Sequence, residues 1–346
     1  MSIDLAAYSD PSIYSTEVNS IFSERLYVGN SGDLAETDSY RSFKIGRKIV
    51  TVRRTDEGIR AFSNVCLHRS NLIDPLGDGK RRFSCGFHGW SYGADGELEF
   101  APFTDKSCIE HRSLRVFPVA ETDGFLFVGL SGEQPPIEKF SAAIKKLGVT
   151  RSPTFHSETL LHHCNWKLLV ENILESYHLN FVHRGTFLKS GFTSTSIHEW
   201  ASDAYINTAS IVPDASTDKT KAIHRLAKNA THSYKHAYVF PNLFISNTND
   251  LIGYVSHLLP IDETKTMLTW ELFELPEMLL LPHPIRDHIR NEAINFSQIT
   301  LGEDKCMVEA CQTGVTSETG SIQLQPIEGR VKQFHDYYSE RMRHVK

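Results

Sequence analysis

Hydrophobic positions follow two different patterns in the two parts of the chain. From about residue 21 to 130 the apolar and β-branched residues form short runs, separated by turns rich in glycine. Residues 48–64 predict two strands around an Asp-Glu-Gly turn, and residues 98–103 and 124–130 predict further strands. The Gly/Pro-rich residues 131–140 then predict a domain boundary. We therefore expect a small, loop-rich β domain in the first part.

The second part mixes helical and strand patterns. Residues 165–178 have helical spacing, and residues 237–247 and 267–275 predict strands. Residues 284–315 predict a long, interrupted helix near the end of the chain. Strands followed by a closing helix indicate a helix that lies over an antiparallel sheet, so the second part is expected to be an α+β domain.

The composition is that of a globular protein with room for two domains. At about 100–200 residues per domain, 346 residues suffice for one domain over 21–135 and a second over 136–346, on which residues 1–20 would pack. A net charge of −6 does not indicate a nucleic-acid partner, and no apolar run approaches the length of a membrane span. The N-terminus lacks the pattern of a secretory signal, and six cysteines do not form a disulfide scaffold in a chain of this size. We expect a soluble cytoplasmic protein without a membrane partner.

Two cysteine–histidine pairs stand in the predicted β domain. Cys66 and His68 are two positions apart, and Cys85 and His88 are three positions apart. Thiolates and imidazoles bind zinc or an iron–sulfur cluster, but zinc modules more often pair like with like, whereas each pair here is mixed. A Rieske [2Fe–2S] centre needs two cysteines on one iron and two histidines on the other. The pattern favours this cluster over zinc and over chance spacing.

The segments CLHR and CGFHGWSYGADGEL resemble the Rieske motif of ring-hydroxylating and related Rieske non-haem iron oxygenases. The family usually reads Cys-Pro-His-Arg-Gly in the first loop, where this chain has Leu67 and Ser70. All four ligand positions are kept. Leu67 and Ser70 are therefore expected to affect the rigidity of the loop and the redox potential of the cluster more than the presence of the cluster.

A second group of chemically active residues stands in the segment ENILESYHLNFVH. On a helix, Glu171, Glu175 and His178 fall on one face, at offsets of four and seven. His183 would point about 140° away from His178 on an unbroken helix. For both histidines to bind one ion, the helix must end or distort within residues 179–182. The alternative is an ordinary amphipathic helix.

The surroundings of these histidines resemble the family's mononuclear iron motif. NWKLLVEN…ESYHLNFVH matches its pattern, which implies that His178 and His183 bind iron. Non-haem iron(II) oxygenases use two histidines and one carboxylate. GEDKCMVEACQ resembles the late family segment that supplies this carboxylate, which implies Asp304, with Glu303 and Glu309 as alternatives and a solvated surface helix as the non-functional interpretation. Similar histidine spacings recur elsewhere and are interpreted as structural: His283 with His288, and His232 with His236.

Glu175 occupies the family's bridging-carboxylate position. By resemblance, its carboxylate would link His178 to His88 of the partner subunit and so couple the two metal centres. An ordinary ion pair on a helix is the alternative. The same resemblance implies a helix-grip, START-like catalytic domain and a head-to-tail homotrimer.

The resemblance also implies an enzyme that uses O2 and electrons to oxidise a small organic substrate. The chain has no G-x-G-x-x-G fingerprint and no Cys-rich ferredoxin spacing, so NAD(P)H would be oxidised by a separate flavin or iron–sulfur reductase. The short chain favours hydroxylation or oxidative demethylation of a quaternary ammonium or aromatic compound over cis-dihydroxylation. Residues 200–207, 240–249 and 253–257 are expected to line the pocket. A Rieske electron carrier and a non-catalytic zinc- or ligand-binding module are the alternatives from other functional classes.

Overall fold

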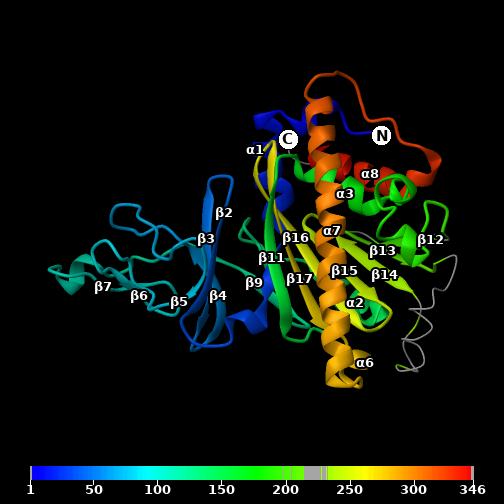
Figure 1. The fold of residues 1–346 in the computed structure, drawn as a ribbon. Helices are drawn as coiled ribbons and strands as arrows, with labels where there is room; N and C mark the ends of the chain where they lie inside the picture. Colours follow the sequence, from blue (N-terminus) through cyan, green and yellow to red (C-terminus); the bar gives the residue numbers. More distant parts are fainter. Residues whose placement is uncertain are drawn as a thin grey trace. The chain divides into compact units, whose positions relative to one another are not determined.

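The computed structural model describes residues 2–196, 198–203, 205–213, 227, 231 and 233–343. The chain divides into two compact units (Figure 1). Val18–Ile137 forms the first, called the β unit below, and Met1–Glu17 with Glu138–Lys346 forms the second, called the α+β unit. None of the helices in the described ranges combines the length and the apolar content that a bilayer crossing requires.

The β unit consists of three small antiparallel sheets, with strand orders β5-β2-β3-β4-β8, β1-β10-β9 and β6-β7. Strands β3 and β4 pair around the predicted Asp-Glu-Gly turn, which confirms that prediction. The strands expected at 98–103 and 124–130 are present but shorter. The elements are α1 (Pro11–Glu24), which starts in the α+β unit, and β1 (Leu26–Asn30), η2 (Ser31–Leu34), β2 (Ser39–Ile45), β3 (Lys48–Thr55), β4 (Gly58–Ser63), β5 (Gly77–Lys80), β6 (Ser91–Tyr92), β7 (Leu98–Phe100), η3 (Lys106–Cys108), β8 (Val116–Phe117), β9 (Val119–Thr122) and β10 (Phe125–Val128).

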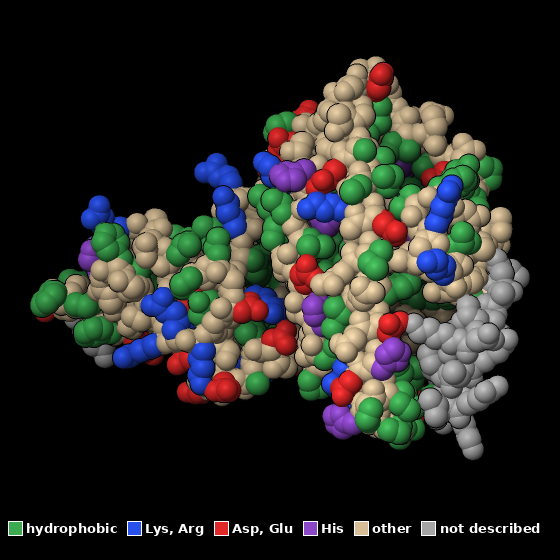
Figure 2. All heavy atoms as spheres, viewed as in Figure 1, with side chains coloured by type: hydrophobic (Ala, Val, Ile, Leu, Met, Phe, Trp, Pro, Cys, Tyr) green, Lys and Arg blue, Asp and Glu red, His purple; other side chains and the backbone are tan. Residues whose placement is uncertain are grey.

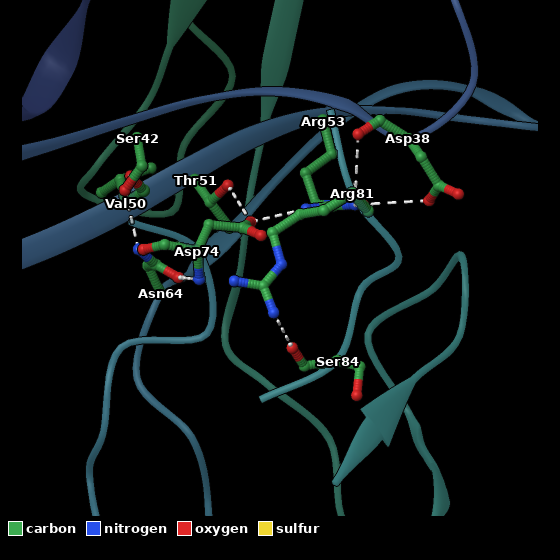
Figure 3. A network of polar contacts seen from close by, with 9 residues as sticks. All are labelled: Asp38, Ser42, Val50, Thr51, Arg53, Asn64, Asp74, Arg81 and Ser84. Carbon is green, nitrogen blue, oxygen red and sulfur yellow. Dashed lines mark hydrogen bonds and ion pairs between the residues drawn. The ribbon is translucent and has the colours of Figure 1, made fainter. Parts of the chain in front are cut away.

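A buried ion pair ties the β unit together (Figure 3). Arg53 on β3 is 1% exposed and contacts both oxygens of the Asp74 carboxylate, at 2.7 and 2.6 Å. Asp74 also exchanges hydrogen bonds with Asn64, and Arg53 donates to the C=O of Arg81. Arg81 in turn donates to the C=O of Ser84 at 3.0 Å. The network therefore holds the chain on both sides of the segment that carries Cys66 and His68, and just ahead of the segment that carries Cys85 and His88.

The α+β unit is built on one antiparallel sheet of seven strands in the order β11-β17-β16-β15-β14-β13-β12. The long helix α7 runs across this sheet (Figure 1). The elements are η1 (Leu5–Tyr8), α2 (Phe140–Leu147), β11 (Thr154–His162), α3 (Trp166–Leu174), α4 (Leu179–Val182), η4 (Leu188–Ser190), β12 (His198–Asp203), β13 (Ile206–Ile211), β14 (Tyr234–Val239), β15 (Leu243–Thr248), β16 (Ile252–Asp262), β17 (Lys265–Glu274), α6 (Pro276–Leu279), α7 (His283–Val315), η5 (Pro326–Glu328) and α8 (Gly329–Arg343).

The two faces of this sheet have different partners. Successive side chains on a strand point to opposite faces. On one face, called the inner face below, Tyr234 of β14 packs against the ring of Phe187, which in turn packs against Phe296 of α7. On the other face, Asn247 of β15 donates to the C=O of Leu147 in α2. The α+β architecture, with a helix over an antiparallel sheet, is confirmed.

Three predicted elements of the α+β unit were wrong in detail. The segment 237–247 forms two paired strands, β14 and β15, joined by a turn at Phe240–Pro241. Helix α7 is continuous through Gly302 and Gly314, because each glycine inside a helix costs only about 1 kcal/mol, which packing against α3 and β11 offsets. The helix expected over 165–178 ends at Leu174, where Glu175 adopts an extended conformation.

The first 17 residues are bound into the α+β unit by a buried charge network. Glu17 accepts from Lys167 at 2.6 Å, from the indole of Trp166 at 2.9 Å and from the hydroxyl of Tyr338 at 2.6 Å. Both Glu17 and Lys167 are fully buried. Because a buried charge is tolerated only when it is paired, this network fixes the start of α3, the helix that leads to His178.

Candidate metal centres

The two cysteine–histidine loops of the β unit fold in the same way. In the first loop, the N–H of Cys66 donates to the C=O of Asn71 at 2.9 Å, and its C=O accepts from the N–H of Ser70 at 3.0 Å. Around Cys85 the equivalent bonds are 2.8 and 2.9 Å, with Gly89 in the place of Ser70. Ser70 and Gly89 both have left-handed φ values, 57° and 71°. The serine therefore keeps the loop geometry at a cost of about 1–2 kcal/mol in backbone strain.

Hydrogen-bond donors surround both thiols. Cys66 and Cys85 are buried and interact with each other. The hydroxyl of Tyr92 donates to Cys66 Sγ at 3.2 Å, and the amide of Asn71 donates to Cys85 Sγ at 3.6 Å. Burial raises the pKa of the Cys66 thiol. Burial acts in the same direction on Cys85, but the N–H donors of Phe87 and Asn71 outweigh it and lower the pKa of Cys85. The donors thus favour the thiolate of Cys85, and at Cys66 the Tyr92 hydroxyl offsets only part of the effect of burial.

The two histidines of these loops meet at the surface. His68 Nδ1 lies 3.2 Å from His88 Nδ1, and the ring of His68 stacks on Trp90 at 4.8 Å. Two sulfurs on the buried side and two ring nitrogens on the exposed side fit the donor set of a Rieske [2Fe–2S] cluster. Hydrophobic side chains gather around this end of the β unit, as the face in Figure 2 shows. The exposed ones are Leu67, Phe87, Phe100 and Phe103.

A second set of ligand atoms converges in the α+β unit. His178, His183 and Asp304 each bring one ligand atom within 4.8 Å of the others. Asp304 Oδ1 lies 3.0 Å from His183 Nε2 and 3.6 Å from His178 Nε2. This oxygen is buried and accepts no hydrogen bond from the described residues. Two imidazoles and one carboxylate, with an orphaned oxygen between them, fit the 2-His-1-carboxylate set of mononuclear iron(II).

The predicted break between the two histidines is absent, because residues 179–182 are helical, and the helix is interrupted earlier. Helix α3 ends at Leu174, and His178 and His183 flank the short helix α4. The distortion therefore occurs at residues 175–178 and not at 179–182. Glu175 stabilises the break, because its Oε2 accepts the backbone N–H of His178 at 3.1 Å.

The predicted grouping of Glu171 with Glu175 and His178 on one helical face was wrong, because α3 ends between these glutamates. Glu171 instead accepts from the hydroxyl of Tyr8 and pairs with His335 Nε2 at 2.9 Å. Its role is to hold the N-terminal segment and α8 to α3.

Each histidine of the convergent set also has its second ring nitrogen held by a glutamate. Glu175 Oε1 contacts Nδ1 of His178, and Glu303 Oε2 lies 2.8 Å from Nδ1 of His183. Burial disfavours the protonated form of His183, but the carboxylates of Asp304 and Glu303 outweigh it and raise its pKa. Because a carboxylate on Nδ1 fixes the tautomer, both Nε2 atoms are the ones available as ligands.

Glu303 is the alternative ligand to Asp304, but its contact with Nδ1 of His183 is that of an orienting group. The sequence shows that Glu303 stands beside Asp304, but it does not show that the Glu303 side chain points at His183. The other rival, Glu309, accepts the backbone N–H of His163 at 2.8 Å.

The described histidines of the other two pairs are not part of the convergent ligand set, and part of the predicted pocket lines a cavity. His283 and His288 are exposed on α7. His236 lies on the inner sheet face and contacts Arg330, while His232 lies outside the described residues. Of the predicted pocket residues, Ser202, Tyr205, Ile206, Asn207 and Phe240 line a small cavity with α8, and Ala204 lies outside the described residues. Arg330 was not foreseen.

Comparisons with known proteins identify a family for each of the two units. Residues 24–118 match the Rieske [2Fe-2S] domain, and residues 150–344 match the ring hydroxylating alpha subunit (catalytic domain). The glycine betaine monooxygenase oxygenase subunit of Chromohalobacter salexigens is 32% identical over 185 residues, which are 51% of this chain and 42% of that relative. The alignment thus spans less than half of that relative's length. Putrescine 2-hydroxylase of Ralstonia nicotianae is 25% identical over 97% of this chain and 94% of its own length.

Solved structures have the same fold. A quaternary ammonium Rieske monooxygenase, described in connection with carnitine oxidation, superposes with a TM-score of 0.81 at 18% identity, covering 100% of this chain and 95% of the other. Naphthalene 1,2-dioxygenase from Rhodococcus sp. gives a TM-score of 0.78 at 18% identity, with 99% and 94% covered. At this identity the likeness concerns the fold alone. The chain belongs to the ring-hydroxylating oxygenase alpha-subunit family, with a Rieske [2Fe–2S] domain ahead of its mononuclear-iron catalytic domain.

Proposed function

We propose that the chain is the oxygenase component of a multicomponent Rieske oxygenase. It would use O2, and electrons from a separate NAD(P)H-dependent reductase, to hydroxylate or oxidatively demethylate a small organic substrate. Relatives named as monooxygenases of glycine betaine, choline and carnitine support this type of reaction. The relative named toluate 1,2-dioxygenase subunit alpha supports cis-dihydroxylation of an aromatic ring as the alternative.

One observation carries the proposal. His178 and His183 direct their Nε2 atoms toward the buried Oδ1 of Asp304, and a glutamate holds each Nδ1. An electron carrier has no need of such a set in a second unit. A closed structural zinc site would be expected to have four protein ligands, whereas three with open positions suit catalysis.

The residues would divide the work as follows. Cys66, Cys85, His68 and His88 would hold the cluster, and His178, His183 and Asp304 would hold the iron. When bound, the cluster supplies single electrons and the mononuclear iron(II) activates O2. Glu175 and Glu303 keep both imidazoles in the Nδ1–H tautomer, so that the ligand atoms meet without reorganisation.

The proposal includes a head-to-tail homotrimer, which family resemblance supports. In such a ring Glu175 would contact His88 of the partner subunit as well as His178 of its own chain. The Glu175 side chain is 14% exposed, so part of its carboxylate remains accessible. Its contact with His178 supplies one half of the proposed bridge.

Metal and sulfide counting after anaerobic purification tests the function. An oxygenase should contain about three irons and two acid-labile sulfides per chain, since a [2Fe–2S] cluster and one mononuclear iron add together. About two irons that cannot be raised by added Fe(II) would point to a carrier, and zinc without sulfide would refute the proposal. With a surrogate reductase and oxygen-18 gas, one labelled atom in the product indicates monooxygenation and two indicate dihydroxylation.

A further inference from the structure

Arg330 is a buried cation with neutral partners. It lies in the first turn of α8 and is 4% exposed. Its Nε donates to Oδ1 of Asn207 at 2.6 Å, and its Nη1 donates to Nε2 of His236 at 2.8 Å. The third nitrogen, Nη2, is buried and finds no hydrogen-bond partner within the described part of the chain. One edge of the guanidinium is therefore left for something else.

Electrostatics make this arrangement costly for the protein alone. No described carboxylate forms an ion pair with Arg330, whose neighbours are an amide, an imidazole and the phenol of Tyr234. Burial lowers the pKa of Arg330 to about 9, so the side chain remains a cation at neutral pH. A buried, unpaired charge is strongly disfavoured, and a cation at a helix N-terminus opposes the helix dipole. An anion at the free edge would remove both penalties.

The guanidinium lies on the same face of the sheet as the iron ligands. Asn207 and His236 belong to β13 and β14 and share the inner face with Tyr234. Tyr234 interacts electrostatically with both Asp304 and Arg330. The Tyr234 ring lies 5.2 Å from the ring of His236, the partner of Arg330, so geometry also places Arg330 on the inner face.

Aromatic side chains line the space around this route. The ring of Phe187 lies 5.4 Å from His183 and 6.1 Å from Tyr234. Tyr234 and Tyr254 are only partly covered although both belong to the inner face. Arg330 also borders a cavity of about 20 Å³, room for roughly one water molecule, with a largely aromatic lining that includes Tyr205, Tyr238, Phe240, Phe334 and Tyr337.

We infer that the substrate carries a carboxylate that pairs with the free edge of Arg330, and that this pairing selects among substrates. The inference rests on the proposed function. A carboxylate supplies the charged acceptor that Nη2 lacks, whereas a hydroxyl carries no charge and an ammonium group repels the guanidinium. Betaines and aryl carboxylates fit this chemistry. Choline-like alcohols and diamines do not, because they would leave Arg330 without a counterion.

A purely structural role for Arg330 is the competing explanation, because its bonds to Asn207 and His236 also fasten α8 to the sheet. The two explanations differ in what they predict for ligands of matched shape. A structural tie is indifferent to the charge of a ligand. A recognition residue binds the carboxylate and rejects its neutral isostere.

Calorimetric titration of the metal-loaded, anaerobic wild-type protein distinguishes these explanations without turnover. The probes are two matched pairs, benzoate with benzamide and glycine betaine with choline. We expect the carboxylate of at least one pair to bind at least about tenfold more tightly than its partner, as a charge-assisted pair requires. Equal affinities within both pairs, or no binding by either carboxylate, would overturn the inference.

Variants then assign the effect to Arg330. Arg330→Gln should abolish the preference for the carboxylate, Arg330→Lys should keep part of it, and Lys332→Gln on the exposed side of the same helix should leave it unchanged. If Arg330→Gln does not fold, the wild-type pairs still decide the matter. Iron and sulfide counts on the same samples separate the two proposals, since a full metal content without charge preference contradicts only the inference about Arg330.

Discussion

Glu303 Oε2 lies 2.8 Å from Nδ1 of His183, on the opposite edge of the ring from Asp304. Two adjacent residues of α7 thus contact the two nitrogens of one imidazole. Asp304, itself a candidate ligand, faces Nε2, and Glu303 holds Nδ1. Thr186 also donates to this glutamate oxygen, at 3.2 Å. Each candidate histidine ligand therefore has its ring orientation fixed by a glutamate.

Replacing Glu303 by Gln should weaken the binding of mononuclear iron by about 10–100-fold, because the ring of His183 loses a charged hydrogen-bond partner. Chelator competition measures the affinity, and the visible spectrum of the cluster should not change. Glu309→Gln is the matched control on the same helix, since among the described residues the Glu309 carboxylate contacts the His163 backbone and Lys305 and neither candidate iron histidine. An unchanged iron affinity in Glu303→Gln would contradict the role of Glu303 in orienting His183.

Replacing Glu175 by Gln should leave both metal centres largely occupied and reduce turnover by at least about tenfold. The amide oxygen can still accept from His178, but the negative charge of the proposed bridge is lost. Metal content, the cluster spectrum and substrate-dependent oxygen uptake are measured on one preparation. Normal oxygen uptake would refute the coupling role, while loss of iron would show that Glu175 acts only through His178.

Replacing Asp74 by Asn should lower the free energy of unfolding of the β unit by about 3–5 kcal/mol, because Arg53 would remain buried without its counterion. The cluster should then be lost at a lower temperature, which thermal bleaching of its visible absorption records. Asp78→Asn is the control. Its carboxylate pairs with Arg41 but is 58% exposed, so the expected cost is below about 1 kcal/mol.

Glu274 should make the α+β unit sensitive to acid. Burial raises the pKa of this carboxyl group, but hydrogen bonds from Arg286 and Arg290 outweigh burial and lower it. A lowered folded-state pKa adds stability that is present above the unfolded value of about 4.3 and disappears as the pH falls through the folded-state pKa. Glu274→Gln should therefore cost about 1–3 kcal/mol at pH 7 and little in strong acid.

Denaturant titrations of wild type and Glu274→Gln at pH 7 and in the acid range provide the comparison. Asp287→Asn is the matched control, because Asp287 is 57% exposed and its ion pair with Arg290 is 3.5 Å long. A difference between wild type and Glu274→Gln that stays constant with pH would contradict the assignment.

The parts of the site that the sequence predicted are those in which neighbours along the chain are also neighbours in space. The loops of Cys66 and Cys85 are of this kind, because each is closed by bonds spanning four or five residues. The end of α3 was misplaced because an extended residue at Glu175 leaves no mark in the hydrophobic pattern. The direction of Glu303 depends on how α7 is rotated over the sheet. Arg330 belongs to no motif, and only tertiary packing reveals that it lacks a counterion.

The division of the chain into units has a consequence for the order of synthesis. The β unit is one continuous stretch, so all four of its cysteine and histidine positions leave the ribosome within a single folding domain. The α+β unit closes only when residues 1–17 meet α8, and 120 residues separate His183 from Glu303. At about 5–20 residues per second, the histidine pair waits about 6–24 s for its carboxylates. Cluster assembly can therefore begin before Asp304 is synthesised, whereas selective loading of the mononuclear iron has to wait for that residue.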